Sequence, residues 1–164
     1  MNIEIRRASL VERDSLWQII EPVIRKGGSY VFAQDSSKEK IMDYWMGEDK
    51  WTFVAESSGE VVGTFYLKAN QPDLGDHICN AGFIVSPQAT GRGVGRFMGK
   101  MALEEACRLG FLAMQFNFVI KSNTSAVKLW QSLGFQIIGE IPDAYRHPNL
   151  GWVSALVMYQ KLSS

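Results

Sequence analysis

The apolar residues of the chain follow two spacings, one of every second residue and one of every third or fourth. The first spacing is typical of a strand with one buried face, and the second of an amphipathic helix. Glycine, serine and proline residues between the segments mark turns and helix ends. The predicted elements are a strand at 3–8, a helix at 10–25, a loop from residue 29, a helix from Ser36 or Ser37 through Trp45, strands at 51–57, 61–69 and 77–85, a helix at 94–109, a strand at 112–119, a helix at 123–133, a strand at 135–140, a loop at 141–151 and a strand at 152–161.

Two features of the predicted strands bear on the rest of the argument. The strongest hairpin signal joins residues 51–57 to residues 61–69 through a short polar turn. Gly82 lies inside the strand at 77–85, and an interior glycine indicates a bulge or the close approach of another backbone. No repeat or linker interrupts the pattern, so residues 1–164 are expected to form a single domain.

Charge and hydropathy narrow the classes of function. The chain has 164 residues, its 17 Lys and Arg residues are balanced by 17 Asp and Glu residues, and 46% of its residues are hydrophobic. The charge balance speaks against nucleic acid as a partner, and the apolar content speaks against disorder. Charged residues interrupt the N-terminal segment, and no uncharged apolar run approaches about 18 residues, so neither a signal peptide nor a membrane span is predicted.

The cysteines give little support for redox or metal chemistry. Only Cys79 and Cys107 occur, and they lack the C-x-x-C spacing of a metal or redox site. Reduced thiols in a cytoplasmic protein are therefore expected, and no metal site is predicted.

A glycine-rich segment from Val85 to Gly95 stands between a predicted strand and a predicted helix. At such a junction, backbone N–H groups and the positive end of the helix can hold a phosphate, because glycines let a ligand approach the backbone. By itself the spacing fits a flexible connection equally well. A dinucleotide-binding fold is disfavoured, because three antiparallel-looking strands precede the segment and no acidic residue ends a following strand.

This segment resembles the glycine motif of the Gcn5-related N-acetyltransferase (GNAT) family, whose cofactor is acetyl-CoA. The family pattern Q/R-x-x-G-x-G/A fits in two registers, starting at Gln88 or at Thr90. We favour Thr90, because that register begins the helix at the periodic residue Val94, although a threonine then replaces the usual Gln or Arg. Arg92 and Arg96 are candidate charge partners of the pyrophosphate, or else solvated arginines.

A second segment, from Asn123 to Phe135, resembles the family signature N-x-x-A-x-x-L-Y-x-x-x-G-F. In the family, this asparagine and its helix flank the pantetheine arm, and the tyrosine commonly protonates the departing thiolate. Trp130 stands at the tyrosine position, and an indole is no proton donor of that kind. Trp130 is expected to pack against the cofactor or the core. The cofactor-binding residues that the two motifs imply are Phe83, Ile84, Val85, Thr90, Gly91, Arg92, Gly93, Val94, Gly95, Arg96, Asn123, Ala126 and Trp130.

Three asparagines are the candidate polar groups of the reaction site. Asn80 precedes the glycine turn, Asn117 lies in an apolar strand, and Asn123 begins a helix. A buried amide needs hydrogen-bond partners. Each asparagine is either a ligand-binding residue or one that caps the backbone, and the capping alternative is strongest for Asn123 as a helix N-cap.

One subgroup of the family is especially similar. The strings H77-I-C-N-A-G-F83 and F116-N-F-V119, with the tail residues 144–148 and 155–159, resemble the fungal azetidine-2-carboxylate N-acetyltransferases and their bacterial relatives. This resemblance implies that Asn80 and Asn117 act at the reacting end. It also implies a small amine substrate that bears a carboxylate.

The chemistry needs an oxyanion donor and an acceptor for the amine proton. Backbone N–H groups near Phe83 to Val85 are the candidate oxyanion donors. No base stands out: the candidates are His77, Tyr145 and His147, or a water held by Asn80 and Asn117. Tyr30 and Phe32 in the loop are expected to close over the substrate or to pack in the core, and Tyr145 is a further candidate for substrate contact.

The sequence therefore predicts a mixed α/β GNAT-like domain, with a twisted, mostly antiparallel sheet, a splayed parallel strand pair and flanking helices. The predicted activity is acetyl transfer from acetyl-CoA to a small-molecule amine, most simply an amino or imino acid. The alternatives are acetylation of a protein N-terminus or an antibiotic amine, and a non-catalytic module that binds acetyl-CoA. Exposed apolar surface would support a homodimer.

Overall fold

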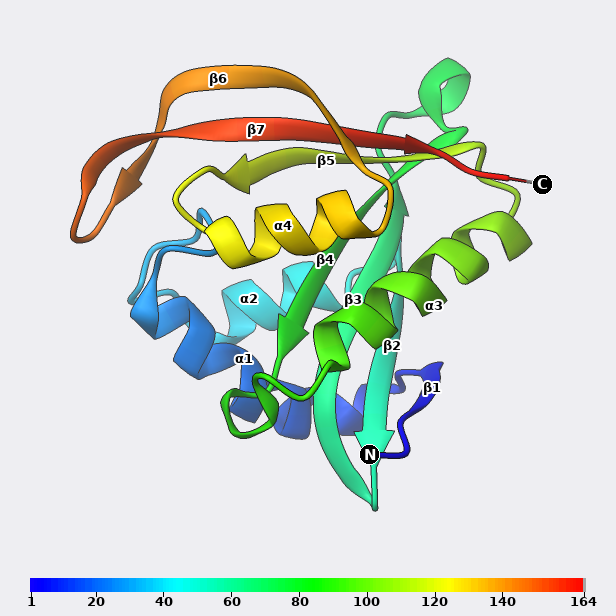
Figure 1. Cartoon of the computed structure of the whole chain (residues 1–164). Helices are drawn as coiled ribbons and strands as arrows, with labels where there is room; N and C mark the ends of the chain where they lie inside the picture. Colours follow the sequence, from blue (N-terminus) through cyan, green and yellow to red (C-terminus); the bar gives the residue numbers. More distant parts are fainter. Residues whose placement is uncertain (164) are drawn as a thin grey trace.

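The computed structural model describes residues 1–163 and shows one seven-stranded sheet in the order β1-β2-β3-β4-β5-β7-β6 (Figure 1). The strands are β1 (Glu4–Arg7), β2 (Lys50–Ser57), β3 (Glu60–Ala69), β4 (Ile78–Val85), β5 (Ala113–Ile120), β6 (Gln136–His147) and β7 (Gly151–Lys161). The α-helices are α1 (Arg13–Lys26), α2 (Lys38–Trp45), α3 (Val94–Arg108) and α4 (Thr124–Ser132). Short 3₁₀ turns lie at Leu10–Glu12, Asp73–Gly75 and Pro87–Ala89.

The helix starts follow local capping chemistry. Ser37 caps α2, because its hydroxyl accepts a hydrogen bond from the N–H of Lys40, which decides between the two predicted starts. The predicted helix at 10–25 begins as a 3₁₀ turn, and the α-helix proper starts at Arg13. Helix α3 starts at Val94, directly after Gly93 with φ 81°, which agrees with the motif register that begins at Thr90.

Strands β4 and β5 are parallel and then diverge, as predicted. Their pairing is limited to Ile78 with Ala113 and Cys79 with Met114, while every other neighbouring pair in the sheet is antiparallel. Figure 1 shows β4 running away from β5 beyond this short pairing. The mixed α/β fold with a splayed parallel pair is therefore confirmed.

The predicted loop at 141–151 is wrong. Most of it belongs to β6 and β7, and residues 148–150 form the connection. The pairing of β6 with β7 shifts register between Ile141 and Tyr145, and Asp143 has a φ of 48°. Pro142 lies within this irregularity on an edge strand, where its missing N–H breaks no ladder, so a turn-like sequence is accommodated inside a strand.

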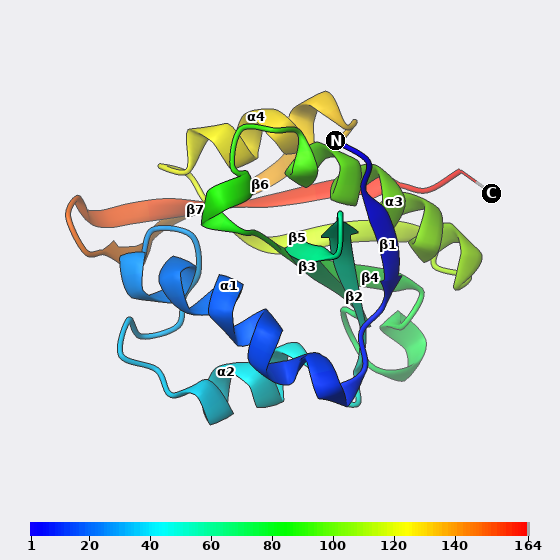
Figure 2. The same cartoon turned by 90° about the horizontal axis from the view of Figure 1, so that it is seen from below.

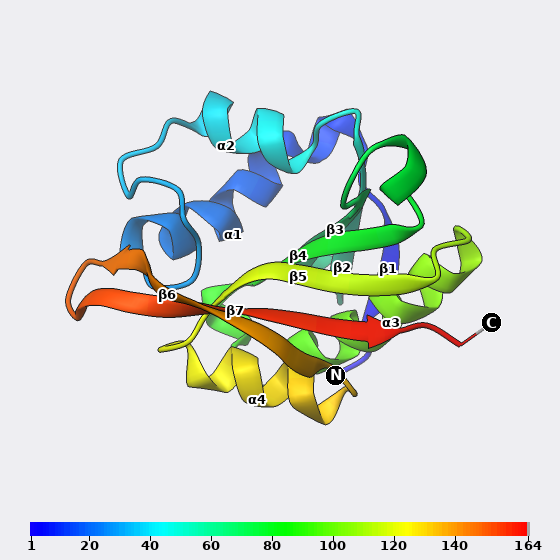
Figure 3. The ribbon, with the colours of Figure 1, turned by 90° about the horizontal axis from the view of Figure 1, so that it is seen from above.

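Two apolar layers cover the sheet. Helices α3 and α4 lie on one face and α1 and α2 on the other (Figures 2 and 3). Met98 and Ala102 of α3 pack into the first layer, and Leu16 and Ile20 of α1 into the second. Within residues 1–163, no helix is long and apolar enough to cross a membrane.

Candidate active site

A cavity of about 730 Å³ lies where β4 and β5 diverge. It extends from the loop after α1, along β4 and the turn before α3, to β5 and the start of α4. The predicted site residues that line it are Tyr30, Phe32, Asn80, Phe83, Ile84, Val85, Thr90, Gly91, Gly93, Val94, Gly95, Arg96, Asn117, Asn123, Ala126 and Trp130.

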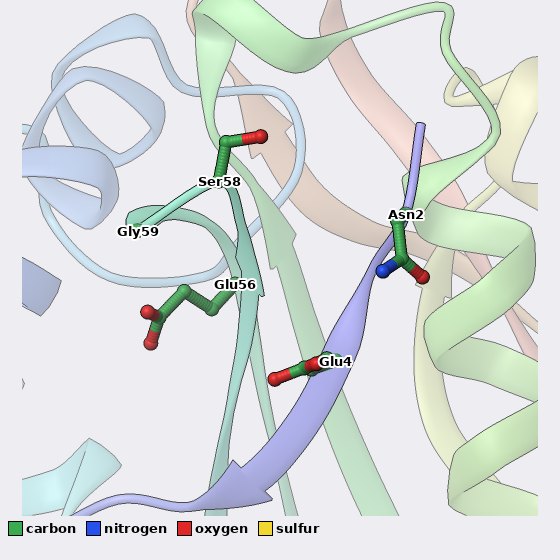
Figure 4. A pocket seen from close by; sticks show the side chains of 5 residues that line it. All are labelled: Asn2, Glu4, Glu56, Ser58 and Gly59. Atoms are coloured by element: carbon green, nitrogen blue, oxygen red, sulfur yellow. The ribbon is translucent and has the colours of Figure 1, made fainter.

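A smaller pocket of about 290 Å³ lies by the β2–β3 turn and the start of the chain (Figure 4). It is lined by Asn2, Glu4, Glu56, Ser58 and Gly59. Glu56 already pairs with Arg6, and the pocket shares no residue with the larger cavity. We therefore place the candidate site in the larger cavity.

The open edge of β4 presents backbone groups that β5 no longer pairs. Hydrogen bonds from the N–H of Asn70 to Ile78 and from the N–H of Ser86 to Val62 show that the even-numbered residues of β4 pair with β3. Because successive peptide groups point to opposite neighbours, Ala81, Phe83 and Val85 point to the open side. This side faces the diverging β5.

Two of these three N–H groups are already used. Asn80 Oδ1 accepts a hydrogen bond from the N–H of Ala81 at 2.8 Å. The Tyr30 hydroxyl accepts from the N–H of Phe83 at 2.8 Å and donates to the carbonyl of the same residue at 2.7 Å. Among the described residues, the N–H of Val85 has no such side-chain partner. Of the predicted oxyanion donors between Phe83 and Val85, the N–H of Val85 is therefore the one left as a candidate.

The backbone-capping alternative holds in part for Asn80 and fails for Asn123. The Oδ1 atom of Asn80 caps the next residue, while its Nδ2 atom has no partner within the described chain. Asn123 occupies the N-cap position of α4, yet its side chain makes no capping hydrogen bond. Within residues 1–163, its Oδ1 atom accepts only from the Ser125 hydroxyl, at 3.3 Å. Both amides therefore retain hydrogen-bonding capacity at the cavity wall.

Asn117 is exposed and belongs to a short chain of amides. Its Nδ2 atom donates to Asn70 Oδ1 at 2.7 Å, and its Oδ1 atom accepts from Gln115 Nε2 at 3.0 Å. Sequence reasoning missed Asn70 and Gln115. Gln115 is two residues from Asn117 on a strand, so a shared face was readable from the sequence, whereas the contact with Asn70 depends on the fold.

The glycine turn leaves open space beside its backbone. Gly91 and Gly93 both have φ 81°, and a Cβ atom at either position would meet no atom of the protein within 4 Å. Arg96 Nη1 donates to the Ser132 hydroxyl at 2.6 Å, which ties α3 to α4 beside the cavity. Arg92, between the two glycines, is exposed and is not part of the cavity wall, so its predicted contact with the pyrophosphate stays a prediction.

Trp130 fills the space beneath the diverging strands. Its ring centroid lies 4.8 Å from that of Phe83 on β4 and 4.8 Å from that of Phe116 on β5. Only 8% of the residue is exposed, and it borders the cavity. The ring therefore packs in the core and forms part of the cavity wall, which confirms the predicted core packing, while contact with the cofactor stays a prediction.

Aromatic side chains form the wall on the side of α1 and α2. The hydroxyl groups of Tyr44 and Tyr66 are 3.1 Å apart, and the Lys50 ammonium lies 3.9 Å from the centre of the Tyr44 ring. A Cβ at Gly82 would clash with the Tyr66 ring, so the close approach predicted at this glycine is made by a side chain and not by a backbone. Burial raises the pKa of Tyr30 and of Tyr66, which keeps both phenols protonated.

None of the predicted side-chain bases belongs to the cavity wall. The Tyr145 hydroxyl accepts a hydrogen bond from the N–H of Gly28 at 2.9 Å, so this residue holds the loop after α1 and its predicted substrate contact is corrected. His147 Nδ1 accepts from the N–H groups of Asn149 and Leu150, and His77 is exposed outside the cavity.

The charge of the cavity wall is positive. Among the residues that the structure describes, the wall contains Lys26 and Arg96 and no carboxylate. The part of the chain that the structure describes has no cluster of three or more His, Cys, Asp or Glu side chains that could hold a metal ion. A neutral or anionic ligand suits such a wall better than a polycation.

Comparison with known proteins agrees with this geometry. The acetyltransferase (GNAT) family matches residues 16–135. The structure of a GCN5-related N-acetyltransferase from Kribbella flavida is similar, with 36% identity, 98% of each chain covered and a TM-score of 0.91. N-acetyltransferase aca1 of Schizosaccharomyces pombe is 40% identical over 98 residues, which are 59% of this chain and 47% of that protein. The match thus spans about half the length of this relative.

A more distant structure shares the fold. The phosphinothricin acetyltransferase of Sinorhizobium meliloti, solved with acetyl-CoA, is 20% identical, with 99% of this chain and 90% of that chain covered and a TM-score of 0.87. The family match covers most of the chain, and the Kribbella protein aligns along nearly all of it. The chain therefore belongs to the acetyltransferase (GNAT) family, and its predicted enzyme class, an acetyl-CoA-dependent N-acetyltransferase, is confirmed.

Proposed function

We propose that the protein transfers the acetyl group of acetyl-CoA to the amine of a small amino or imino acid. The observation that carries the proposal is the cavity between β4 and β5, where amide side chains and phenol rings meet and no carboxylate is present. An acceptor that bears a carboxylate would meet hydrogen-bond donors and no opposing negative charge. The resemblance to the azetidine-2-carboxylate N-acetyltransferases supports the same acceptor class.

The glycine turn would bind the pyrophosphate of acetyl-CoA. The space above Gly91 and Gly93 is open, and the first N–H groups of α3 face outward at its N-terminus. Asn123 and Ala126 at the start of α4 would border the pantetheine arm, since both line the cavity. Acetyl-CoA supplies an activated thioester. The residues of this chain supply its binding surface and orientation.

At the reacting end, the N–H of Val85 would donate to the oxygen that develops negative charge. The Tyr30 hydroxyl accepts from the N–H and donates to the carbonyl of the neighbouring Phe83, and so holds this part of β4 in place. Because Trp130 provides no acidic proton, the thiolate would leave with a proton from solvent. The amine proton would pass to a water held by Asn80 and Asn117, since no His, Asp or Glu side chain lines the cavity.

The alternatives fit the cavity less well. A polycationic antibiotic amine would meet Lys26 and Arg96 without any carboxylate to neutralise it. A non-catalytic module would retain the glycine turn but would not need the polar groups of Asn80 and Asn117. Acetylation of a protein N-terminus remains the second candidate, because the cavity is open at its rim. A cytoplasmic location and a homodimer stay predictions.

Release of free thiol from acetyl-CoA tests the proposal. The purified protein is assayed against azetidine-2-carboxylate, proline, primary amino acids, polyamines, aminoglycosides and short peptides. Stimulation by the imino or amino acids alone is the expected result. Stimulation by peptides or aminoglycosides alone would show that these, and not small amino or imino acids, are the acceptors. Binding of acetyl-CoA without release of thiol with any amine would favour the non-catalytic module.

A further inference from the structure

The amide of Asn117 is held from two sides by residues that do not line the cavity. Gln115 donates to its oxygen at 3.0 Å, and Asn70 accepts from its nitrogen at 2.7 Å. Of these three residues, only Asn117 lines the cavity. Gln115 precedes it on β5, and Asn70 follows the end of β3. The chain of amides thus connects the cavity to the segment beyond β3, on the far side of β4 in the sheet.

This arrangement couples the orientation of the Asn117 amide to that of its two partners. A carboxamide has two acceptor positions on its oxygen and two N–H groups on its nitrogen. One of each is taken, so one acceptor position and one N–H remain for a ligand. A free amide could rotate by half a turn and exchange its oxygen and nitrogen. With a donor on one side and an acceptor on the other, rotation of Asn117 alone would break both hydrogen bonds, so the amide can reverse only if Asn70 and Gln115 reverse with it.

We propose that Asn70 is a positioning residue for the acceptor site, which orients the Asn117 amide by accepting its Nδ2 hydrogen. Asn70 is half-buried, and its own N–H is bound to the Ile78 carbonyl at 2.8 Å, so its side chain extends from a fixed backbone. Ile78 lies at the end of β4 where pairing with β5 begins. Asn70 therefore links the Asn117 amide to the end of β4 that is paired with β5.

The inference rests on the proposed function, because it takes Asn117 as the group that meets the acceptor. It concerns a second residue, Asn70, and its effect on the orientation of the Asn117 amide. An oriented amide presents its free N–H and its free lone pair to the acceptor in one arrangement. A disoriented amide divides its population between two arrangements, which weakens acceptor recognition without touching the glycine turn.

A double-mutant cycle tests this role. The variants are Asn70→Ala, Asn117→Ala and the double variant, and Gln71→Ala is the matched control, because Gln71 is the neighbouring exposed amide. The measured quantities are kcat/KM for the acceptor, KM for acetyl-CoA and Tm. We expect Asn70→Ala to lower acceptor kcat/KM about 5- to 10-fold, as loss of one hydrogen bond predicts. KM for acetyl-CoA should stay within about twofold.

The cycle distinguishes the positioning role from a structural one. The Asn70→Ala effect should vanish in the Asn117→Ala background, because Asn70 acts through that amide. Equal effects of Asn70→Ala in both backgrounds, or an effect no larger than that of Gln71→Ala, would overturn the proposal. If Asn117→Ala is fully active while Asn70→Ala is not, the assignment of Asn117 in the proposed function fails as well.

A second readout does not depend on finding the acceptor or on activity. The side-chain amide resonances of Asn117, measured by NMR on the whole protein, should shift in Asn70→Ala and remain in place in Gln71→Ala. Unchanged Asn117 resonances in Asn70→Ala would show that the hydrogen bond is not formed in solution, and this would overturn the inference whatever the acceptor is.

Discussion

At the scale of single residues, the site depends on where polar groups find partners. The Tyr30 hydroxyl is the clearest case, because it takes the place of the missing β5 partner for the N–H and the carbonyl of Phe83. The sequence indicated that Tyr30 either faces the ligand or packs in the core, and the structure gives it a hydrogen-bonding role as well. Aromatic spacing cannot reveal such a role, since the peptide it satisfies lies 53 residues away.

Tyr30→Phe should therefore destabilise the protein and slow acetyl transfer. The change leaves the N–H and the carbonyl of Phe83 without a partner, a loss of about 1–3 kcal/mol if water cannot reach them. Tyr159→Phe is the matched control, because Tyr159 is half-buried on β7 and its hydroxyl has no hydrogen-bond partner among the described residues. Chemical denaturation and thiol release measure the two effects. Equal stability of the two variants would contradict the role of Tyr30.

Gly93→Val should weaken acetyl-CoA binding. A Cβ at Gly93 meets no protein atom, so the added side chain would occupy the space assigned to the phosphates. Gly110→Val is the control, because Gly110 also has a positive φ and open space but lies beyond the other end of α3. Both variants carry backbone strain of about 1–3 kcal/mol. Only Gly93→Val should raise the Kd of acetyl-CoA, about 10-fold or more, by calorimetry.

At the scale of elements, the divergence of β4 from β5 is held open by packed rings. Trp130 contacts Phe83 on one strand and Phe116 on the other. The sequence motif placed this tryptophan at the position of a catalytic tyrosine, and helical spacing indicated its buried face. The two strands it separates could be predicted only through the resemblance, because strand pairing over many residues has no local signal.

Trp130→Phe tests whether the Trp130 ring keeps β4 and β5 apart. The smaller ring leaves space beneath the splay, so the free energy of unfolding should fall by about 1–3 kcal/mol, and affinity for acetyl-CoA should fall with it. Trp152→Phe is the control, since Trp152 is 64% exposed on β7. Denaturation and calorimetry provide the two values. A fully stable Trp130→Phe variant with unchanged affinity would show that the ring does not support the cavity.

The error at residues 141–151 belongs to the same scale. Proline, aspartate and asparagine in this segment are typical of a loop. The structure extends two strands through most of it, and a register shift absorbs Pro142 and Asp143. Local turn propensity was outweighed by pairing with β7, which a sequence pattern does not contain.

At the scale of the whole molecule, most of what could be predicted about the fold and the site came from the two sequence motifs. They identified the family and the start of α3 at Val94, because these depend on local spacing, and the splayed strands followed from the resemblance to the family. The sequence did not predict the contacts between distant segments, such as Asn70 with Asn117 and Gly28 with Tyr145. These contacts depend on strand order and twist, which bring the segments together only after folding.

The pH dependence of the free energy of unfolding should show the contribution of Cys79, which is buried next to the strand divergence. Burial raises the pKa of its thiol to about 12. The unfolded thiol ionises near pH 8.5, so stability from this group is complete below about pH 8.5 and is lost as the pH rises toward 12. The free energy of unfolding should therefore fall less steeply between about pH 8.5 and 11 in Cys79→Ala than in wild type. Parallel pH curves would contradict this linkage.

The central claim is that acetyl transfer to a small amino or imino acid occurs beside the amides of the β4–β5 cavity. The most direct test is thiol release with the imino acid acceptor in wild type, in Asn117→Ala and in Asn149→Ala, an exposed asparagine of the β6–β7 connection. Asn117→Ala should lower turnover at least about 10-fold with acetyl-CoA affinity nearly intact, while Asn149→Ala matches wild type. Full activity of Asn117→Ala would contradict the account.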